Sequence, residues 1–376
     1  MDNGNVNLDA TQQFSALRSH SAELGADPCQ IQGAGGNTSI KQGGIMWIKA
    51  SGKWLQHADQ DELFVPVALA PLLEALQAGD PRAEKSTDFV VNELNPQGLR
   101  PSIETTLHAV LRQRVVIHVH CVDTISLAIQ QDAQALLSAR LTTFNWEFIP
   151  YVRPGLPLSR SIASRIKADT NVLVLGNHGL VVAADSVEAC LALLNRVRAA
   201  VFCEIRQFQS NSVSVNKGAS AAGLLTHKDL MRRIDTSDYV PALSPETHVI
   251  AFDAVGLAVA AGGSLYPDHV IFLGKGTVVA KPDEPLSAVL QRCELEDLPK
   301  PVSIVFPGEG VALIREATPG QQAMARCLSD VCLRVPANVA VNYLTDIQNH
   351  ELLHWEAEQY RQALSQPEST VGEHTP

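Results

Sequence analysis

The chain has 376 residues, of which 45% are hydrophobic and 18% charged, and it carries a formal net charge of −11. This composition is typical of a globular protein, and the length favours two domains over a single core. The negative charge argues against nucleic acid or an anionic membrane surface as a partner. An anionic substrate would therefore need a local positive site, which a metal ion and backbone N–H groups can provide.

Alternating helical and strand patterns over residues 1–210 predict an α/β domain. We expect a helical lead-in that ends by residue 30, a glycine-rich turn over 32–39, and short strands over 45–48 and 63–67. The pattern then predicts helices over 68–77, 101–112 and 159–167, a strand over 172–175, and a long helix to about 207. Ser186 supplies a capping oxygen at the start of that last helix.

A stretch rich in Ser, Asn, Gly and Ala over 211–224 has no hydrophobic periodicity and is interpreted as a linker. We expect a second, smaller α/β domain over 225–366 and a disordered tail over 367–376. Its predicted strands lie near 249–252, 269–273, 277–280, 302–306 and 310–314, and its long helices near 320–333 and 350–365.

Residues 305–313 of the second domain resemble residues 174–182 of the first, with Glu309 at the position of His178. Two explanations stay open, a chance similarity between α/β units and a degenerate repeat. The second domain has no pair of histidines on a strand, so we expect no metal there.

No targeting segment is recognised, because the first five residues are polar and lack the basic and apolar regions of a secretion signal. The longest apolar stretch, around 249–261, is interrupted by Asp253 and is too short to span a bilayer. The seven cysteines are scattered and form no C-x-x-C pair, which favours free thiols in a reducing cytoplasm.

Three histidines form the most informative pattern in the chain. His118 and His120 alternate along the apolar run 115–120, so in a strand they point to the same face about 7 Å apart. His178 lies in a glycine-flanked turn after the apolar run 172–175. Three imidazoles on rigid elements, with no obvious fourth protein ligand, are typical of an open catalytic metal site.

Small residues at three places suggest a phosphate site. The turn over 33–39 contains Asn37 and Ser39, the turn over 49–53 contains Ser51 and Gly52, and Ser102 is expected at a helix N-terminus. Glycines allow close backbone approach, and free N–H groups attract anions. Ordinary tight turns are the alternative.

Glu104 and His108 lie four residues apart in the predicted helix that precedes the histidine strand. Beside a divalent cation, Glu104 would act as a general base; its alternative is a surface acid that favours the helix dipole. We interpret His108 as a packing or supporting histidine. The run His350-Glu-Leu-Leu-His354 matches the zincin pattern, but little chain follows it to complete a protease site.

Five separated motifs occur in the order seen in class II aldolase/adducin proteins: Gly36-Asn37-x-Ser39, Ser51-Gly52, Ser102-x-Glu104-x-x-x-His108, His118-x-His120 and Asn177-His178-Gly179. The resemblance covers about residues 10–210 and implies a central, mainly antiparallel sheet with helices on both faces. Two further segments, Pro150-Tyr151-Val152-Arg153-Pro154-Gly155 and Pro267-Asp268-His269-Val270, resemble the aldolase unit of rhamnulose-1-phosphate aldolases that are fused to a dehydrogenase. The chain is expected to be that aldolase unit without the dehydrogenase part.

The resemblance implies a metal-dependent lyase that cleaves the C3–C4 bond of a ketose phosphate. It implies that His118, His120 and His178 bind Zn²⁺ or a similar ion such as Mn²⁺, and that Glu104 is the acid/base. Tyr151 is near a family tyrosine that donates a proton to the aldehyde. The phosphate would be held by a group of small and polar residues: Gly36, Asn37, Ser51, Gly52 and Ser102. A cytoplasmic homo-oligomer, often a tetramer, is the implied assembly.

Other functions remain compatible with the same pattern. The scaffold also hosts sugar-phosphate 4-epimerases, decarboxylases and dehydratases, and in adducin it is a non-catalytic binding module. The three histidines favour an enzyme, since adducin-like domains have lost them. A glutamate at position 104 favours the aldolases.

Overall fold

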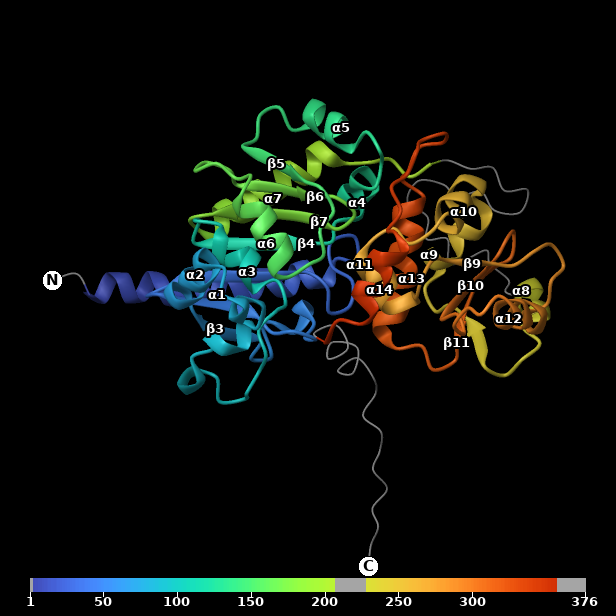
Figure 1. Ribbon diagram of the computed structural model, residues 1–376, viewed down its shortest axis with the longest axis horizontal. Helices are drawn as coiled ribbons and strands as arrows, with labels where there is room; N and C mark the ends of the chain where they lie inside the picture. Colours follow the sequence, from blue (N-terminus) through green and yellow to red (C-terminus); the bar gives the residue numbers. More distant parts are fainter. Residues whose placement is uncertain (1–2, 207–227, 357–376) are drawn as a thin grey trace, which may run out of the picture.

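The computed structural model describes residues 3–206 and 228–356 and shows two sheets, each with its own helices (Figure 1). The predicted linker 211–224 and tail 367–376 lie outside these ranges, so the proposed domain boundaries stay a prediction. None of the described helices combines the length and the apolar character needed to cross a bilayer.

In the described part of the chain, the first sheet has seven strands in the order β3-β2-β1-β4-β7-β6-β5. All neighbours are antiparallel except β5 and β6, which are parallel. The strands are β1 (Asn37–Gln42), β2 (Ile45–Lys49), β3 (Phe64–Ala68), β4 (Val115–Val119), β5 (Trp146–Ile149), β6 (Val172–Leu175) and β7 (Gly179–Ala184).

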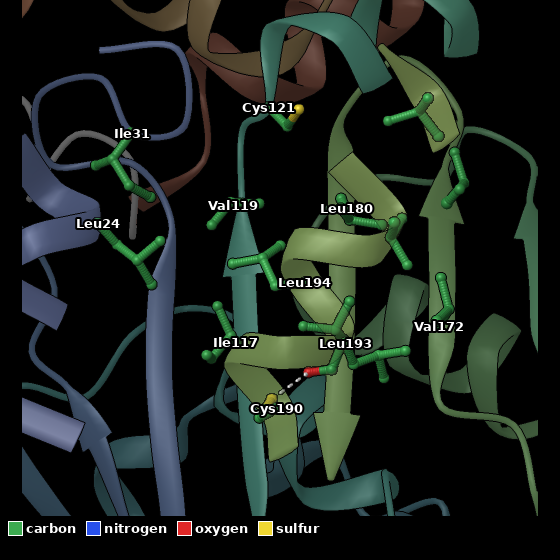
Figure 2. Close-up of a cluster of buried hydrophobic side chains, with 14 of the residues drawn as sticks. Leu24, Ile31, Ile117, Val119, Cys121, Val172, Leu180, Cys190, Leu193 and Leu194 are labelled. Atoms are coloured by element: carbon green, nitrogen blue, oxygen red, sulfur yellow. Dashed lines mark hydrogen bonds between the residues drawn. The ribbon is translucent and has the colours of Figure 1, made fainter. Parts of the chain in front are cut away.

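Helices cover both faces of this sheet, as predicted. They are α1 (Asn3–Ala26), α2 (Leu69–Ala78), α3 (Thr105–Val110), α4 (Val122–Ala128), α5 (Ala133–Arg140), α6 (Leu156–Ala163) and α7 (Val187–Val201). Short 3-10 helices link them at Leu55–His57, Pro81–Glu84, Ser86–Phe89 and Asn92–Leu94. Side chains of β4 alternate between the two faces of the sheet. Ile117 and Val119 pack against α1 and α7 (Figure 2). Val116 packs on the opposite face, with α3 and α6. His118 shares the face of Val116.

The helix predicted over 101–112 is shorter than expected. It begins at Thr105, with Glu104 as its N-cap, and Ser102 belongs to a turn whose carbonyl accepts from the Thr105 hydroxyl at 2.5 Å. The expectation of Ser102 at a helix N-terminus was therefore wrong. Pro101 explains the difference, because its bridge to Ala50 keeps this segment extended beside β2.

The second sheet has four strands among the described residues: β8 (Tyr239–Pro241), β9 (Val278–Val279), β10 (Ser303–Phe306) and β11 (Gly310–Ile314). Its helices are α8 (Lys228–Arg233), α9 (Pro245–His248), α10 (Ala254–Ala261), α11 (Pro267–Leu273), α12 (Leu286–Leu295), α13 (Pro319–Cys332) and α14 (Asp346–Leu353), with a 3-10 helix at Val249–Phe252.

Two predicted strands of the second half are helical. Residues 249–252 form the 3-10 helix and residues 269–273 belong to α11. A short apolar run cannot by itself distinguish a buried strand from a buried helix. Here the start signals decide: Pro267 sits at the first turn of α11, and the Asp253 carboxylate accepts from the Gly256 N–H to cap α10.

The second sheet repeats the connectivity of half of the first. Its order β8-β11-β10-β9, with two antiparallel contacts and a parallel one, matches β4-β7-β6-β5. Both hairpins span three residues, from Leu175 to Gly179 and from Phe306 to Gly310, and both have a positive φ at the middle residue. This agreement favours the degenerate-repeat explanation over chance.

The two halves share a hydrophobic core. Apolar residues of α4 pack with α11 and α13 in one buried cluster. Main-chain hydrogen bonds join Asn342 N to Ile129 O at 2.7 Å and Gln131 N to Ala340 O at 2.9 Å. The Arg334 guanidinium lies 2.9 Å from the Asp123 carboxylate. These contacts fix the second half against the end of β4 that carries His120.

Candidate functional site

The three predicted histidines converge at one edge of the first sheet. His118 is in β4, His120 follows its last residue, and His178 lies in the β6–β7 turn, which the pairing of β4 with β7 brings alongside. Their ligand nitrogens all lie within 4.8 Å of one another, and no other such group of three occurs among the described residues. All three side chains are buried.

Hydrogen bonds aim the ring nitrogens at a common point. His118 Nδ1 lies 3.0 Å from the carbonyl of Leu180, so it donates there and leaves Nε2 as the lone-pair nitrogen. His118 Nε2 is 3.2 Å from His120 Nε2. Burial lowers the pKa of His118, and it lowers the pKa of His178 to about 3. Neutral imidazoles with converging lone pairs are suited to a cation.

Glu104 adds a carboxylate to this cluster. Its Oε2 is 3.4 Å from His118 Nε2, and its Oε1 is 3.5 Å from His178 Nε2. Four ligands around one tetrahedral ion with bonds of about 2.0–2.1 Å stand about 3.3–3.4 Å apart. The spacing of the three imidazoles and the Glu104 carboxylate therefore suits a single divalent metal ion.

A chain of three polar side chains orients Glu104. Asn37 Nδ2 donates to Glu104 Oε2 at 2.8 Å, and Asn37 Oδ1 accepts from His108 Nε2. His108 Nδ1 in turn contacts the Ser39 hydroxyl at 2.7 Å. Burial lowers the pKa of His108 to about 3, so this histidine is neutral and fixes the amide of Asn37. His108 thus occupies the supporting position that the sequence suggested.

A narrow pocket beside the cluster contains all five predicted phosphate residues. It is lined by Gly36, Asn37, Ser51, Gly52 and Ser102, together with Glu104, His120 and His178. Lys49 also lines it, and its ammonium donates to the carbonyls of Ala34 at 2.6 Å and Gly36 at 3.0 Å. Lys49 begins the predicted turn over 49–53, but sequence reasoning assigned its side chain no role of its own.

Tyr151 does not join this group. It is absent from the pocket lining and packs against the second-half core, where its hydroxyl is buried. Burial and then the charge of Glu351 raise its pKa. Its role as a proton donor stays a prediction. His350 and His354 stack with ring centroids 3.9 Å apart at the end of α14, away from the three converging histidines.

Close packing around the histidines demands small residues. A Cβ on Gly179 would lie 2.5 Å from the Val119 carbonyl and 3.2 Å from His118 Cε1. Asn177 has a φ of +52°, and its side-chain amide donates to the carbonyls of Leu265 at 2.9 Å and Asn342 at 2.7 Å. The Asn177-His178-Gly179 motif therefore both turns the chain and anchors the second half.

The second half contributes a residue that sequence reasoning missed. Asp268 lines the pocket, and its Oδ2 lies 3.0 Å from His120 Nδ1. The only signal in the sequence was the run Pro267-Asp268-His269-Val270, which carries no metal-ligand spacing.

Comparisons with known proteins agree with this geometry. The family model described as "Class II Aldolase and Adducin N-terminal domain" matches residues 26–205. Methylthioribulose-1-phosphate dehydratase of Geobacillus thermodenitrificans is 31% identical over 157 residues, which cover 35% of this chain and 74% of that protein. The uncharacterized oxidoreductase YuxG of Bacillus subtilis is 31% identical over 185 residues, which cover 44% of this chain but only 26% of YuxG.

Among solved structures, the N-terminal class II aldolase domain of a conserved protein from Thermoplasma acidophilum matches 49% of this chain and 90% of that chain, with 24% identity and a TM-score of 0.43. Residues 26–205, which the family model matches, contain the three histidines, Glu104 and the five phosphate candidates. The chain belongs to the class II aldolase and adducin family.

Proposed function

We propose that this protein is a metal-dependent lyase that cleaves the C3–C4 bond of a phosphorylated ketose to a triose phosphate and an aldehyde. The observation that carries the proposal is the position of Glu104, whose two oxygens lie 3.4 and 3.5 Å from two of the three converging imidazoles. The same pocket offers small and polar groups for a phosphate.

His118, His120 and His178 would hold Zn²⁺ or Mn²⁺. The bound cation would act as a Lewis acid for the negative charge that develops on the ketose oxygens when the bond breaks. A local positive centre also offsets the repulsion between an anionic substrate and a protein with a net charge of −11.

Protein groups carry the proton. Cleavage removes the proton of the C4 hydroxyl and leaves an electron pair at C3, which then takes up a proton. Two carboxylates line the pocket, and we assign to Glu104, not Asp268, the role of holding and returning this proton, while Asn37 orients Glu104 Oε2. Buried His108 keeps the Asn37 amide in that orientation.

We assign phosphate binding to the small and polar residues that line the same pocket. Ser51 and Ser102 would donate hydroxyls, and Gly36 and Gly52, both at positive φ, would let the backbone approach closely. Lys49 would add positive charge beside them. Phosphate binding remote from the reacting bond contributes energy for orientation.

Two kinds of alternative remain. The name of the Geobacillus relative favours a dehydratase acting on a ketose 1-phosphate, and epimerases and decarboxylases would use the same metal and glutamate. A non-catalytic adducin-like module would need no metal.

We also propose a cytoplasmic homo-oligomer, a tetramer. Light scattering of the purified chain tests the oligomeric state.

The test is a screen of phosphorylated ketoses and ketonates with Zn²⁺ or Mn²⁺. Triose phosphate as product supports the lyase, whereas a dehydrated diketone, an epimer or CO₂ supports one of the alternatives. We expect His118→Ala to lose metal and turnover together, and Glu104→Gln to keep the metal but lose most activity. The exposed His20→Ala on α1 is the matched control. Undiminished turnover in either site variant contradicts the assignment.

A further inference from the structure

The second half of the chain inserts a carboxylate into the candidate metal centre. Asp268 follows the first residue of α11, a helix between the two sheets (Figure 1). Its side chain is only 4% exposed, and its Oδ2 lies 3.0 Å from His120 Nδ1. Asp268 is outside residues 26–205, so the family match assigns it no role.

The segment that carries Asp268 is held from two directions. Asn177, next to His178, donates to the carbonyl of Leu265, just before α11. His269 accepts from the N–H of Leu265 at 3.2 Å and contacts the carbonyl of Gly276 at 3.1 Å. Every residue of α11 is buried. The carboxylate is therefore fixed by packing and by the hairpin that presents a histidine of the cluster.

Gly35 leaves the space that the contact requires. A Cβ at this position would lie 2.8 Å from His120 Nδ1 and 2.9 Å from Asp268 Oδ2. Real side chains essentially never approach that closely, so any larger residue would displace one partner. Because Gly35 has no positive φ, its need for a small side chain comes from this contact and from the nearby Gln32 carbonyl at 3.0 Å.

A carboxylate at Nδ1 of a metal-binding histidine has a defined effect. It accepts the Nδ1 proton, which selects the tautomer with a lone pair on Nε2, and it fixes the ring and raises its basicity. His120 Nε2 is the nitrogen 3.2 Å from His118 Nε2. The first half orients His118 through the carbonyl of Leu180. At His120 the Asp268 carboxylate of the second half lies beside Nδ1, in the place that the Leu180 carbonyl takes at His118.

We propose that Asp268 is a positioning residue for the metal centre, so that the second half of the chain completes the site instead of only covering it. This inference rests on the proposed function, because it takes His118, His120 and His178 as metal ligands. Loss of such an outer carboxylate typically weakens metal binding by about 10- to 100-fold.

The experiment measures metal affinity in the full chain by competition with a chromophoric chelator, using Zn²⁺ and Co²⁺ and no substrate. We expect Asp268→Asn, which keeps an acceptor without the charge, to weaken binding about 10-fold. Asp268→Ala, which removes the acceptor, should weaken it about 100-fold. Gly35→Ala, which keeps the carboxylate but crowds the contact, should also weaken it.

Asp123→Asn is the matched control. It breaks the 2.9 Å ion pair of Asp123 with Arg334, which also joins the halves, but it leaves the pocket untouched. We expect its metal affinity to stay within about threefold of the parent chain. An equal loss in Asp123→Asn and Asp268→Ala would mean that affinity follows the docking of the halves in general, and would overturn the positioning role.

A second readout reports whether the Asp268 carboxylate holds the Nδ1 proton of His120. In the Co²⁺-loaded chain, proton NMR should show shifted, slowly exchanging Nδ1–H signals for His118 and His120. Asp268→Ala should lose one of them and keep the signal protected by the Leu180 carbonyl. Metal binding that depends on His118 but not on Asp268 overturns this inference alone. Binding that survives His118→Ala overturns the proposed metal centre and the inference with it.

Discussion

Lowering the pH should destabilise the metal-free protein through His269. This side chain is fully buried, and burial lowers its pKa from 6.5 to about 4. Its Nδ1 accepts from the N–H of Leu265, so the folded protein needs the neutral ring. Between pH 6.5 and about pH 4, His269 is protonated in the unfolded chain but stays neutral in the folded chain. The free energy of unfolding therefore decreases as the pH is lowered through this range.

The magnitude follows from these two values. Each pH unit between them changes the free energy of unfolding by about 1.36 kcal/mol, which gives a loss of about 2 kcal/mol between pH 8 and pH 5. Below pH 4 the loss levels off at about 3.4 kcal/mol. Urea denaturation at pH 8 and pH 5, followed by tryptophan fluorescence in the presence of a chelator, measures it.

Other buried histidines also titrate, so a variant must isolate this one. His269→Gln keeps a donor for the Gly276 carbonyl but takes up no proton in this range. The pH 8 to pH 5 loss should be about 2 kcal/mol smaller in this variant than in the parent. Equal losses in the two proteins would show that His269 is not held neutral, and the argument from its burial would fail.

Two further predictions concern the histidine cluster. Metal at a free concentration 100 times its Kd should raise the free energy of unfolding by about 2.7 kcal/mol. Removing the metal with a chelator should therefore lower the Tm of the parent protein but not that of His118→Ala. A parent Tm that is the same with and without metal would argue against the site. Gly179→Ala should lower the free energy of unfolding, measured by urea denaturation, by about 1–3 kcal/mol and should weaken metal binding, because the new Cβ would clash with the Val119 carbonyl. Unchanged stability would mean that β4 and β7 can move apart at this position without loss of stability.

Local pattern was enough to predict much of the first half. Strand alternation put His118 and His120 on one face, and a buried strand delivered His178. The pattern left Glu104 open between a general base and a surface acid, and the family resemblance favoured the first. The strands predicted over 45–48, 63–67 and 172–175 and the strand that carries His118 correspond to β2, β3, β6 and β4, whereas β1, β5, α4 and α5 were not predicted. Such patterns are readable because each depends only on neighbours within one element.

The second half shows where that reasoning ends. Residues 269–273 are apolar and buried on every side as a helix, so they have no periodicity that separates helix from strand. The correspondence of β8-β11-β10-β9 with β4-β7-β6-β5 is likewise a property of strand pairing, and only the segment around 305–313 hinted at it.

By itself, the sequence determined which residues could bind a metal and on which elements they stand, because side-chain direction repeats with the backbone. Only the tertiary structure decided what surrounds them. Asp268 lies 148 residues beyond His120, Ser39 and Asn37 reach His108 from another strand, and Tyr151 turns to the second-half core. Such contacts come from packing between distant elements, where burial and hydrogen bonding select one arrangement and no local spacing records it.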